Sequence, residues 1–359
     1  MSKENCYGLV LAGGHGTRFW PRSRRRCSKQ VLNIFGGSSL IQETYERLKP
    51  SIPPERIWIV TNAEIRSRVV EQLPDVPEQQ ILAEPEGRNT APAIGLVAHI
   101  LHSMDPDALM GVFPSDHAIH KPARLRRLFA AAFVAAGEGK LVVLGIQPRW
   151  PETGYGYMEF PRGTRAGMPV PVAVLKFREK PDERTAKQYV AAERFFWNSG
   201  MFFWRARVLL EQLRLHLPDT AAILDALPPF SDRRFPARLK QTFSACENVS
   251  IDYAVLERAE NLVGIPADDF GWNDLGSWNA VYELLARNSE NNVAITEVIS
   301  RASQRNYIDA GGKIVALVGV NDLIVVDTPD ALLIADRRRT QEVREIVRQL
   351  EREKRDELL

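Results

Sequence analysis

The sequence predicts an α/β protein: a mostly parallel sheet covered by helices, then a small C-terminal unit of β-helix type, then a terminal helix. Three observations support this prediction. Over the first 150 residues, short apolar runs alternate with amphipathic helical segments, the pattern of a parallel sheet with helices on both faces. Past residue 290, short β-like runs are separated by Gly, Pro, Asn and Asp turn residues. The last twenty residues place apolar side chains on one face of a helix.

Strands of the first part are expected at short runs rich in Val, Ile and Leu: 7–12, 56–61, 80–83, 108–113 and 141–146. Helices are expected between them at 40–48, 64–73, 90–104 and 125–136. After residue 150 the alternation weakens. Strand-like pieces at 155–160, 172–179 and 201–204 suit a mixed or antiparallel extension of the sheet, with helices at 183–193, 206–213 and 277–285.

A change of pattern near residue 290 predicts a second domain. Its β-like runs are at 293–298, 307–308, 313–318, 323–326 and 331–335, spaced as in a small all-β unit. Residues 340–359 are predicted to be helical, with an apolar stripe formed by Val343, Ile346, Val347 and Leu350. We therefore expect a large α/β domain at 1–288 and a small β domain with the terminal helix at 289–359.

Composition and charge argue against several classes of protein. The chain has 359 residues, of which 45% are hydrophobic and 26% charged, as in ordinary globular proteins of about two domains. Lys and Arg number 47 against 45 Asp and Glu, so no excess charge points to nucleic acid or a membrane surface. The three cysteines form neither a disulfide framework nor a zinc pattern. No apolar run approaches a membrane span or a signal sequence, and a cytoplasmic location is expected.

The most informative segment is LAGGHGTRFWPRSRRRCSK at 11–29, where a predicted buried strand runs into Gly13, Gly14 and Gly16. Glycines there let the backbone fold around a ligand and point N–H groups at phosphate oxygens. A dinucleotide fingerprint needs glycine where Phe19 stands, and the Gly-Lys-Ser/Thr of a Walker A loop is absent. The segment is therefore either a different phosphate-binding loop or a glycine-rich turn beside a solvated basic face.

Basic side chains follow these glycines. Arg18 and Lys29 supply two cations, which suits a triphosphate. Four more arginines stand between positions 22 and 26, and they form either a solvated face or an attractive field for an anionic substrate.

The series GGxGTR, then Pro, then Lys resembles the signature of the sugar-1-phosphate nucleotidyltransferases, the NDP-sugar pyrophosphorylases. EPEGRNTAPAI at 84–94 is similar to the segment typical of the mannose-1-phosphate guanylyltransferases in that family. Six more blocks follow in the family's order: FPSDH (113–117), TGYGYME (153–159), FREKPD (177–182), WNSGMF (197–202), SIDYAVL (250–256) and WNDLGSW (272–278). The resemblance covers nearly the whole chain. It implies a Rossmann-like nucleotidyltransferase sheet and a short, monofunctional, bacterial-type member without the isomerase domain of longer members.

The resemblance implies transfer of GMP from GTP to α-D-mannose 1-phosphate, giving GDP-mannose and pyrophosphate. A sugar phosphate oxygen attacks the α-phosphorus in line, so catalysis consists mainly of positioning and charge neutralisation. The implied catalytic residues are Arg18, Lys29, Asp116 and Asp274. The implied cofactor is Mg²⁺, held by Asp116 and Asp274.

The same blocks imply the binding residues. Nucleotide contacts are expected from Ala12, Gly13, Gly14, Gly16, Thr17, Arg18, Lys29, Gly87, Asn89, Thr90, Ser115 and Asp116. Sugar-phosphate contacts are expected from Gly154, Glu179, Lys180, Asn198 and Asp274. Lys29 is expected at the α-phosphate, Arg18 at the leaving phosphates and Lys180 at the phosphate of the sugar. GTP and mannose 1-phosphate are the expected partners, without nucleic acid or membrane, and a homodimer stays open.

Two positions depart from the family's pattern: Ser28 stands where proline is usual, and Pro85 where asparagine is common. Two other functions stay open. The first is an NDP-sugar pyrophosphorylase of different sugar or base, against which the GRNTAP block argues. The second is a non-catalytic regulatory homologue, against which the full set of Arg18, Lys29, Asp116, Lys180 and Asp274 argues.

Overall fold

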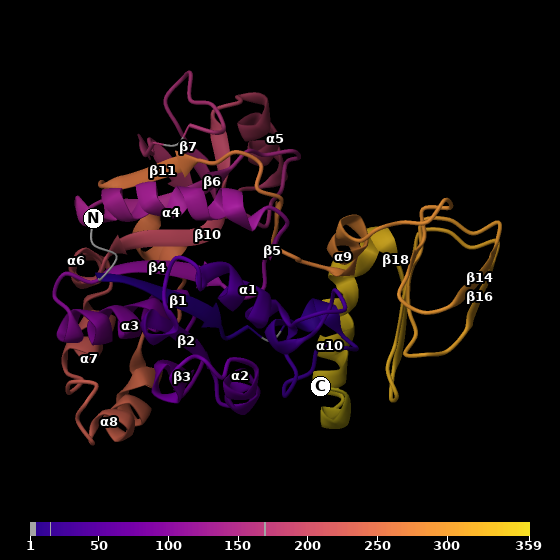
Figure 1. Cartoon of the computed structure of the whole chain (residues 1–359), viewed down its shortest axis with the longest axis horizontal. Coiled ribbons are helices and arrows are strands. Elements are labelled where there is room, and N and C mark those ends of the chain that lie inside the picture. The colour runs from indigo at the N-terminus through magenta and orange to yellow at the C-terminus, as the bar shows by residue number, and fades with distance from the viewer. Residues whose placement is uncertain (1–4, 15, 169) are drawn as a thin grey trace.

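The computed structural model describes residues 5–14, 16–168 and 170–359, and it has two parts (Figure 1). The larger part is a layered α/β fold, and the smaller is a stack of short strands at the other end of the molecule. Helices α9 (Trp278–Leu284) and α10 (Val343–Arg352) lie between the two parts in Figure 1. Among the described residues, no helix has the length and apolar character needed to cross a lipid bilayer.

The central sheet has the strand order β3-β2-β1-β4-β10-β6-β11-β8, and β7 joins β10 to β9. Strands β1 to β4 pair in parallel, and so do β6 and β11, which confirms the mostly parallel sheet. The strands are β1 (Cys6–Ala12), β2 (Ile57–Asn62), β3 (Ile81–Glu84), β4 (Leu109–Pro114), β6 (Leu141–Ile146), β7 (Tyr157–Glu159), β8 (Val172–Ala173), β9 (Lys176–Arg178), β10 (Phe195–Arg205) and β11 (Leu262–Pro266).

Strand β10 is the main departure from the sequence prediction, which placed a strand only at 201–204, in an extension of the sheet. It spans Phe195–Arg205 and runs antiparallel between β4 and β6, in the middle of the sheet. Its sequence FFWNSGMFFWR is apolar on both faces, as a strand covered on both sides requires. The register against β6 shifts between Asn198 and Phe202, and this bulge lies at the carboxyl edge of the parallel strands.

Helices cover both faces of the sheet because successive strand residues point to opposite sides. Leu9 of β1 belongs to a core shared with α3, α6 and α7, and the next residue, Val10, to a core shared with α1, α2 and α4. The helices are α1 (Leu40–Leu48), α2 (Arg66–Gln72), α3 (Thr90–Met104), α4 (Pro122–Gly137), α5 (Glu183–Ala191), α6 (Ala206–His216), α7 (Pro218–Asp225) and α8 (Phe235–Thr242). The sequence prediction lacks α7 and α8, because short helices with proline in the first turn give a weak periodic signal.

The C-terminal strands form the predicted β-helix-like unit. Strands β13 (Val293–Ala294), β15 (Tyr307–Asp309) and β17 (Leu323–Asp327) stack in parallel, and β18 (Leu332–Asp336) pairs antiparallel with β17. A second parallel pair is β14 (Val298–Arg301) with β16 (Val315–Val318). The terminal helix is shorter than predicted, since α10 ends at Arg352 and a 3₁₀ turn follows at Asp356–Leu358.

One apolar core joins the C-terminal unit to the first forty residues. Phe19 and Trp20, which follow the glycine segment, are buried with Trp278 of α9, Tyr307 of β15 and Val347 of α10. The small unit therefore packs directly on the segment for which phosphate binding is predicted. The domain boundary at 288/289 stays a prediction.

Candidate active site

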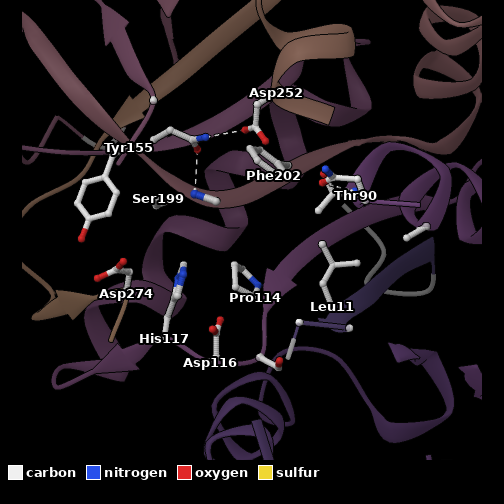
Figure 2. Close-up of a pocket in the computed structure, with 18 of the residues that line it drawn as sticks. Leu11, Thr90, Pro114, Asp116, His117, Tyr155, Ser199, Phe202, Asp252 and Asp274 are labelled. Carbon is white, nitrogen blue, oxygen red and sulfur yellow. Dashed lines mark hydrogen bonds between the residues drawn. The ribbon is translucent and has the colours of Figure 1, made fainter. Parts of the chain in front are cut away.

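A cavity of about 490 Å³ opens at the carboxyl edge of the parallel strands, where ligands bind in open α/β sheets. Segments after β1, β3 and β4 form its wall, together with the β10 bulge and the region of Asp252 (Figure 2). Four lining side chains have a buried polar atom without a hydrogen-bond partner in the described chain: Gln30 Oε1, Glu84 Oε1, Ser115 Oγ and Glu179 Oε2. Buried polar atoms are normally paired, so these four mark the cavity as a site for a polar ligand.

Most of the residues predicted from the sequence line this cavity. They are Gly13, Gly14, Gly87, Asn89, Thr90, Ser115, Asp116, Gly154, Glu179, Asn198 and Asp274. Ala12, Gly16, Thr17, Arg18, Lys29 and Lys180 are not part of its wall. Ala12 is buried beneath the cavity edge, and its carbonyl accepts a hydrogen bond from Thr61 Oγ1 at 3.0 Å.

The glycine segment packs against Lys29. Gly16 has φ +61°, and a Cβ built there would lie 2.5 Å from the Cβ of Lys29, so a side chain at position 16 would push the two segments apart. Gln30 Nε2 donates to the carbonyl of Gly14 at 2.7 Å and ties the two segments together. Position 15, between these glycines, lies outside the described residues.

Lys29 is buried, and its ammonium lies between the two predicted metal ligands. Nζ donates to Asp116 Oδ2 at 2.7 Å and to the backbone carbonyl of Asp274 at 2.9 Å. Arg18 lies on the other side of the Asp274 turn, where its guanidinium donates to the Gly276 carbonyl at 2.8 Å. Both predicted cations therefore contact the loop that carries Asp274.

Asp116 and Asp274 come together because a short antiparallel ladder joins the segments that carry them. Strand β5 (Ala118–Ile119) pairs with β12 (Trp272–Asn273), with Asn273 opposite Ala118. Asp116 lies just before β5 and Asp274 just after β12. The sequence prediction contains neither strand, because two-residue strands have no periodic signal.

The neighbours of Asp116 keep its carboxylate charged. Burial raises the pKa of Asp116, but Lys29, His117 and the hydrogen bond from Lys29 outweigh burial and hold this pKa below its usual value. Burial lowers the pKa of His117, against the pull of Asp116 and Asp274. His117 Nδ1 accepts a hydrogen bond from Trp272 Nε1 at 3.2 Å, so the ring lies fixed between the two carboxylates (Figure 2).

Tyr155 adds a hydroxyl to the wall beside Asp274, and its oxygen points toward that carboxylate in Figure 2. Burial, and then the charge of Asp274 and a hydrogen bond with it, raise the pKa of Tyr155 far above its usual value. The phenol therefore stays protonated and donates toward Asp274.

Two side chains of helix α1 donate hydrogen bonds to the backbone of the Asp116 loop. Thr44 Oγ1 donates to the carbonyl of Ser115 at 3.3 Å, and Arg47 donates to the carbonyl of His117 at 3.2 Å. Burial lowers the pKa of Arg47 to about 10, with Glu43 opposing, so the guanidinium is charged at neutral pH. These two bonds hold the peptide groups on both sides of Asp116.

At the end of the cavity formed by β10, two carboxyl groups face one amide. Asn198 Nδ2 donates to Asp252 Oδ1 at 2.8 Å, and Asn198 Oδ1 accepts from the Gly200 amide at 2.8 Å (Figure 2). Burial raises the pKa of Glu179 to about 7, with Asp252 adding to the rise and Lys180 opposing it. Lys180 Nζ lies 3.1 Å from Glu179 Oε1 and is half exposed.

Gly156 is a site residue that the sequence prediction lacks. A Cβ built on it would lie 2.4 Å from Glu179 Oε2, which is one of the unpartnered atoms. Glycine at this position therefore leaves room for the carboxyl group and for a ligand beside it. The prediction named Gly154, two residues earlier in the same block, and both line the cavity.

At the opposite end, β3 contributes its last residue, Glu84. Glu84 is 9% exposed, and burial raises its pKa to about 7, with a backbone hydrogen bond from Arg88 opposing. Asn89 Oδ1 caps α3 through the Thr90 amide at 2.9 Å, and Thr90 Oγ1 accepts from the Ile251 amide at 2.9 Å. The side chains of Asn89 and Thr90 thus have structural partners, whereas Glu84 Oε1 has none in the described chain.

Gln30, Glu84, Tyr155 and Asp252 line the cavity although the sequence prediction gave none of them a role. Three of the four lie in or beside the sequence blocks that carry the family resemblance, and Gln30 directly follows Lys29. An assignment of every polar residue in those blocks would have found them.

The donor set suits a divalent cation that is shared with a substrate. Among the described residues, no group of three His, Cys, Asp or Glu side chains could hold a metal ion on its own. Asp116 and Asp274 offer two carboxylates on one wall, and neutral His117 has its Nδ1 engaged by Trp272. Two carboxylates plus phosphate oxygens and water form the usual setting of a hard divalent ion at a nucleotide.

One cavity contains a glycine segment, paired carboxylates and a second carboxyl-lined end, and the buried Lys29 contacts the carboxylate of Asp116. This arrangement suits an enzyme that joins a nucleotide to a second polar substrate. Comparison with known proteins narrows this class. The model of the family described as nucleotidyl transferase matches residues 7–291, and that of the MannoseP isomerase/GMP-like beta-helix domain matches residues 296–350.

Relatives agree over almost the full chain. The mannose-1-phosphate guanylyltransferase of Escherichia coli K12 is 41% identical, over 99% of this chain and 76% of the relative. The alginate biosynthesis protein AlgA of Pseudomonas aeruginosa is 37% identical, over 97% of this chain and 73% of that protein. A crystal structure from Thermus thermophilus, described as mannose-1-phosphate geranyltransferase, has a TM-score of 0.85 at 31% identity and covers 97% and 99% of the two chains.

The chain belongs to the nucleotidyl transferase family and, within it, to the group of the mannose-1-phosphate guanylyltransferases. It is therefore a nucleotidyltransferase, as the sequence blocks predict.

Proposed function

We propose that the chain transfers GMP from GTP to α-D-mannose 1-phosphate, forming GDP-mannose and pyrophosphate. One observation supports this most directly: a single cavity joins the glycine segment and the Asp116–Asp274 pair to the end formed by Glu179, Asn198 and Asp252. A nucleotide at the first end and a sugar at the second would meet at the carboxylate pair, where phosphoryl chemistry needs charge neutralisation.

The phosphates are placed along the glycine segment. Backbone N–H groups of Gly13, Gly14, Gly16 and Thr17 supply neutral donors, and Ser115 Oγ is a further donor with no partner in the described chain. Lys29 is positioned for the α-phosphate, because its Nζ already lies at Asp116, and Arg18 is assigned to the leaving pyrophosphate. As the oxygen of the sugar phosphate attacks the α-phosphorus, these fixed cations stabilise the growing negative charge.

We assign the divalent ion as Mg²⁺, with Asp116 and Asp274 as its protein ligands. When bound, Mg²⁺ neutralises phosphate charge and leaves coordination positions for phosphate oxygens and water. Tyr155 and the backbone around Asp274 orient one carboxylate, and helix α1 orients the loop of the other.

Sugar hydroxyls are assigned to the far end of the cavity. Glu179 Oε2 accepts from a hydroxyl, and Asn198, held by Asp252 and Gly200, presents a rigid amide edge. Lys180 reaches the phosphate of the sugar, and Gly154 allows close approach to the backbone.

Guanine is assigned to the end of β3 and the segment that follows it. The N1–H and N2–H groups of guanine are donors, and the buried Glu84 carboxyl is an acceptor without a protein partner for Oε1 in the described chain. Gly87, Asn89 and Thr90 supply backbone contacts beside it. Adenine lacks a donor at N1, so it would leave the Glu84 carboxyl unpaired.

The test is pyrophosphate release with GTP, ATP, UTP and dTTP, each combined with mannose 1-phosphate or glucose 1-phosphate. We expect kcat/KM to favour GTP over ATP by up to about 10⁴-fold, because a buried polar group rejects a ligand that leaves it unpaired. Mannose differs from glucose only in the orientation of one hydroxyl, so we expect kcat/KM to favour mannose 1-phosphate over glucose 1-phosphate by about 10-fold. Higher turnover with another nucleotide would contradict the guanine assignment. Absence of pyrophosphate release from every pair would contradict the catalytic function itself.

A further inference from the structure

Beyond the cavity, the structure brings the C-terminal unit onto the segment that follows the glycines. We define the basic loop as residues 17–31, which run from Thr17 through the arginines to the turn of Lys29. Figure 1 shows α10 beside these early residues of the chain. We propose that the C-terminal unit positions the basic loop for catalysis through contacts with Trp20, Arg22, Arg24 and Arg25.

The arginines of the basic loop are paired with acidic residues of the C-terminal unit. Arg22 contacts Asp309 of β15 at 2.5 Å, Arg24 contacts Asp330 at 2.9 Å, and Arg25 contacts Asp356 at 2.8 Å. A solvated basic face, or a field open to substrate, would leave these guanidinium groups in water. The structure instead gives each of the three a carboxylate partner more than 280 residues away along the chain.

Apolar and backbone contacts reinforce these pairs. Trp20 Nε1 donates to the carbonyl of Leu358 at 2.9 Å, and Trp278 Nε1 donates to the carbonyl of Trp20 at 3.1 Å. The amide of Arg25 donates to the carbonyl of Leu359 at 3.1 Å. Phe19 packs on Trp278 with ring centroids 5.1 Å apart. The basic loop is therefore held from α9, from β15 and from the turn after α10.

The basic loop is compact, so contacts made by its arginines also affect the position of Lys29. Arg24 and Cys27 exchange two backbone hydrogen bonds of 3.0 Å, so the loop folds back on itself between the arginines and Lys29. Lys29 Nζ lies 5.3 Å from the centre of the Phe19 ring, which is buried in the shared core. A shift of Phe19 or of the arginines therefore moves the ammonium that contacts Asp116.

Asp309 is the most informative residue for a test. Its side chain is 5% exposed, against 48% for Asp330 and 70% for Asp356, so the pair with Arg22 is screened least by water. It lies on β15, outside the candidate active site, and it touches neither of the proposed substrates. It contacts Arg22 of the loop and, at 3.5 Å, the hydroxyl of Tyr307 in the core that holds the loop, so an effect on turnover is indirect and makes Asp309 a positioning residue.

The test compares Asp309→Asn with Asp322→Asn. Asp322 lies in the same C-terminal unit, pairs with Arg305 at 2.8 Å and with Arg337 at 3.5 Å rather than with an arginine of the basic loop, and serves as the control. We expect Asp309→Asn to lower kcat and to raise KM for GTP. Their ratio, kcat/KM for GTP, should fall by about 10- to 100-fold, the range that small displacements of catalytic groups produce. Binding of mannose 1-phosphate alone should stay within about twofold of wild type, and Asp309→Glu should recover part of the loss.

Hydrogen exchange supplies a readout that needs no turnover. In Asp309→Asn without substrates, amides of residues 17–31 should exchange faster, whereas amides of β10 and of the Asp252 segment should not change. This inference takes the GTP role of the basic loop from the function proposed above, but the exchange result does not depend on that function. Unchanged exchange and unchanged GTP kinetics in a folded Asp309→Asn protein would overturn the inference. So would equal effects in Asp322→Asn.

If Asp309→Asn does not fold, the double variant Asp330→Asn/Asp356→Asn removes the two exposed pairs and leaves the buried pair intact. Exposed ion pairs contribute little to stability, so this protein should fold. A smaller but specific rise in exchange of residues 17–31 is then expected. No difference from wild type in both exchange and KM for GTP would overturn the inference.

Discussion

Buried carboxyl groups with one unpartnered oxygen are the most informative single residues of this protein. Glu84 and Glu179 lie at opposite ends of one cavity, and burial raises the pKa of each to about 7. In a protein without ligands such groups reduce stability, because they are removed from water and one oxygen of each gains no compensating bond. Their persistence at the wall of a cavity is explained when a ligand supplies the missing donors.

The Glu84→Gln variant tests whether the buried carboxyl lowers stability. The difference in stability between variant and wild type should depend on pH. The folded state holds the Glu84 proton more tightly than the unfolded state, so the contribution of Glu84 to stability falls as pH rises from about 4.5 to about 7 and then levels off. The rise in pKa corresponds to about 3 kcal/mol, which Gln, a neutral isostere, does not lose. The measurement is the free energy of unfolding of both proteins in urea, without nucleotide, from pH 4 to 8.

The difference between the two proteins isolates Glu84, because the contribution of Glu179 is common to both. We expect the stability of Glu84→Gln relative to wild type to rise across this pH window. A difference that does not vary with pH would contradict a raised pKa of Glu84 in the fold.

At the scale of elements, short pieces of structure position the charged groups. The two-residue strands β5 and β12 bring Asp116 and Asp274 to one wall, and the bulge in β10 brings Asn198 to the other end. Helix α1 reaches the Asp116 loop through Thr44 and Arg47, from the face of the sheet away from α3. Each of these elements is defined by partners far away in the sequence.

Arg47→Met should weaken the proposed metal-binding end of the site while keeping most of the apolar volume of the side chain. The carbonyl of His117 loses its donor, which costs about 1 kcal/mol of stability and loosens the Asp116 loop. We expect a higher Mg²⁺ concentration for half-maximal activity, with little change in the KM of mannose 1-phosphate. The measurement is initial rate against Mg²⁺ concentration at saturating substrates.

Arg66→Met is the matched control for this prediction. Arg66 of α2 donates to the carbonyl of Ile81 at 2.9 Å, at the amino end of β3, away from both aspartates. Its loss should lower stability without changing the Mg²⁺ requirement. An equal shift in both variants would attribute the effect to general destabilisation.

At the scale of the whole molecule, the active site is an assembly of segments from residue 11 to residue 274. The two ends of the cavity are built from different parts of the chain. Substitutions at one end should therefore affect one substrate or step without affecting the other. Lys29→Met should lower kcat by about 10²–10³-fold with a smaller effect on GTP binding, because Lys29 is proposed to act on charge that develops in the transition state. Lys180→Ala should mainly raise KM for mannose 1-phosphate, because Lys180 is proposed to bind the phosphate of the sugar.

Calorimetric binding of each substrate alone, together with steady-state kinetics of both variants, distinguishes the two roles. A rise only in KM for GTP in Lys29→Met would place that lysine in ground-state binding. An equal loss of affinity for both substrates in Lys180→Ala would contradict a separate sugar end.

The sequence alone determined the fold class, the strands β1 to β4 and β6, and eleven of the 25 residues that line the cavity. These features depend on local patterns: apolar runs that end at glycine, helical spacing, and short blocks in a fixed order. The structure confirms the mostly parallel sheet and the β-helix-like unit, and it places Asp116, Asp274, Glu179 and Asn198 at one cavity.

Only the tertiary structure decided the rest. It inserted β10 into the middle of the sheet and paired β5 with β12. It also showed that Glu84 and Gln30 each have a buried oxygen without a hydrogen-bond partner in the described chain. It also gave Arg22, Arg24 and Arg25 carboxylate partners in the C-terminal unit, where the sequence predicted a solvated face or a field for an anionic substrate. The physical reason is that burial and charge pairing depend on contacts between residues hundreds of positions apart, and no local pattern in the chain records those contacts.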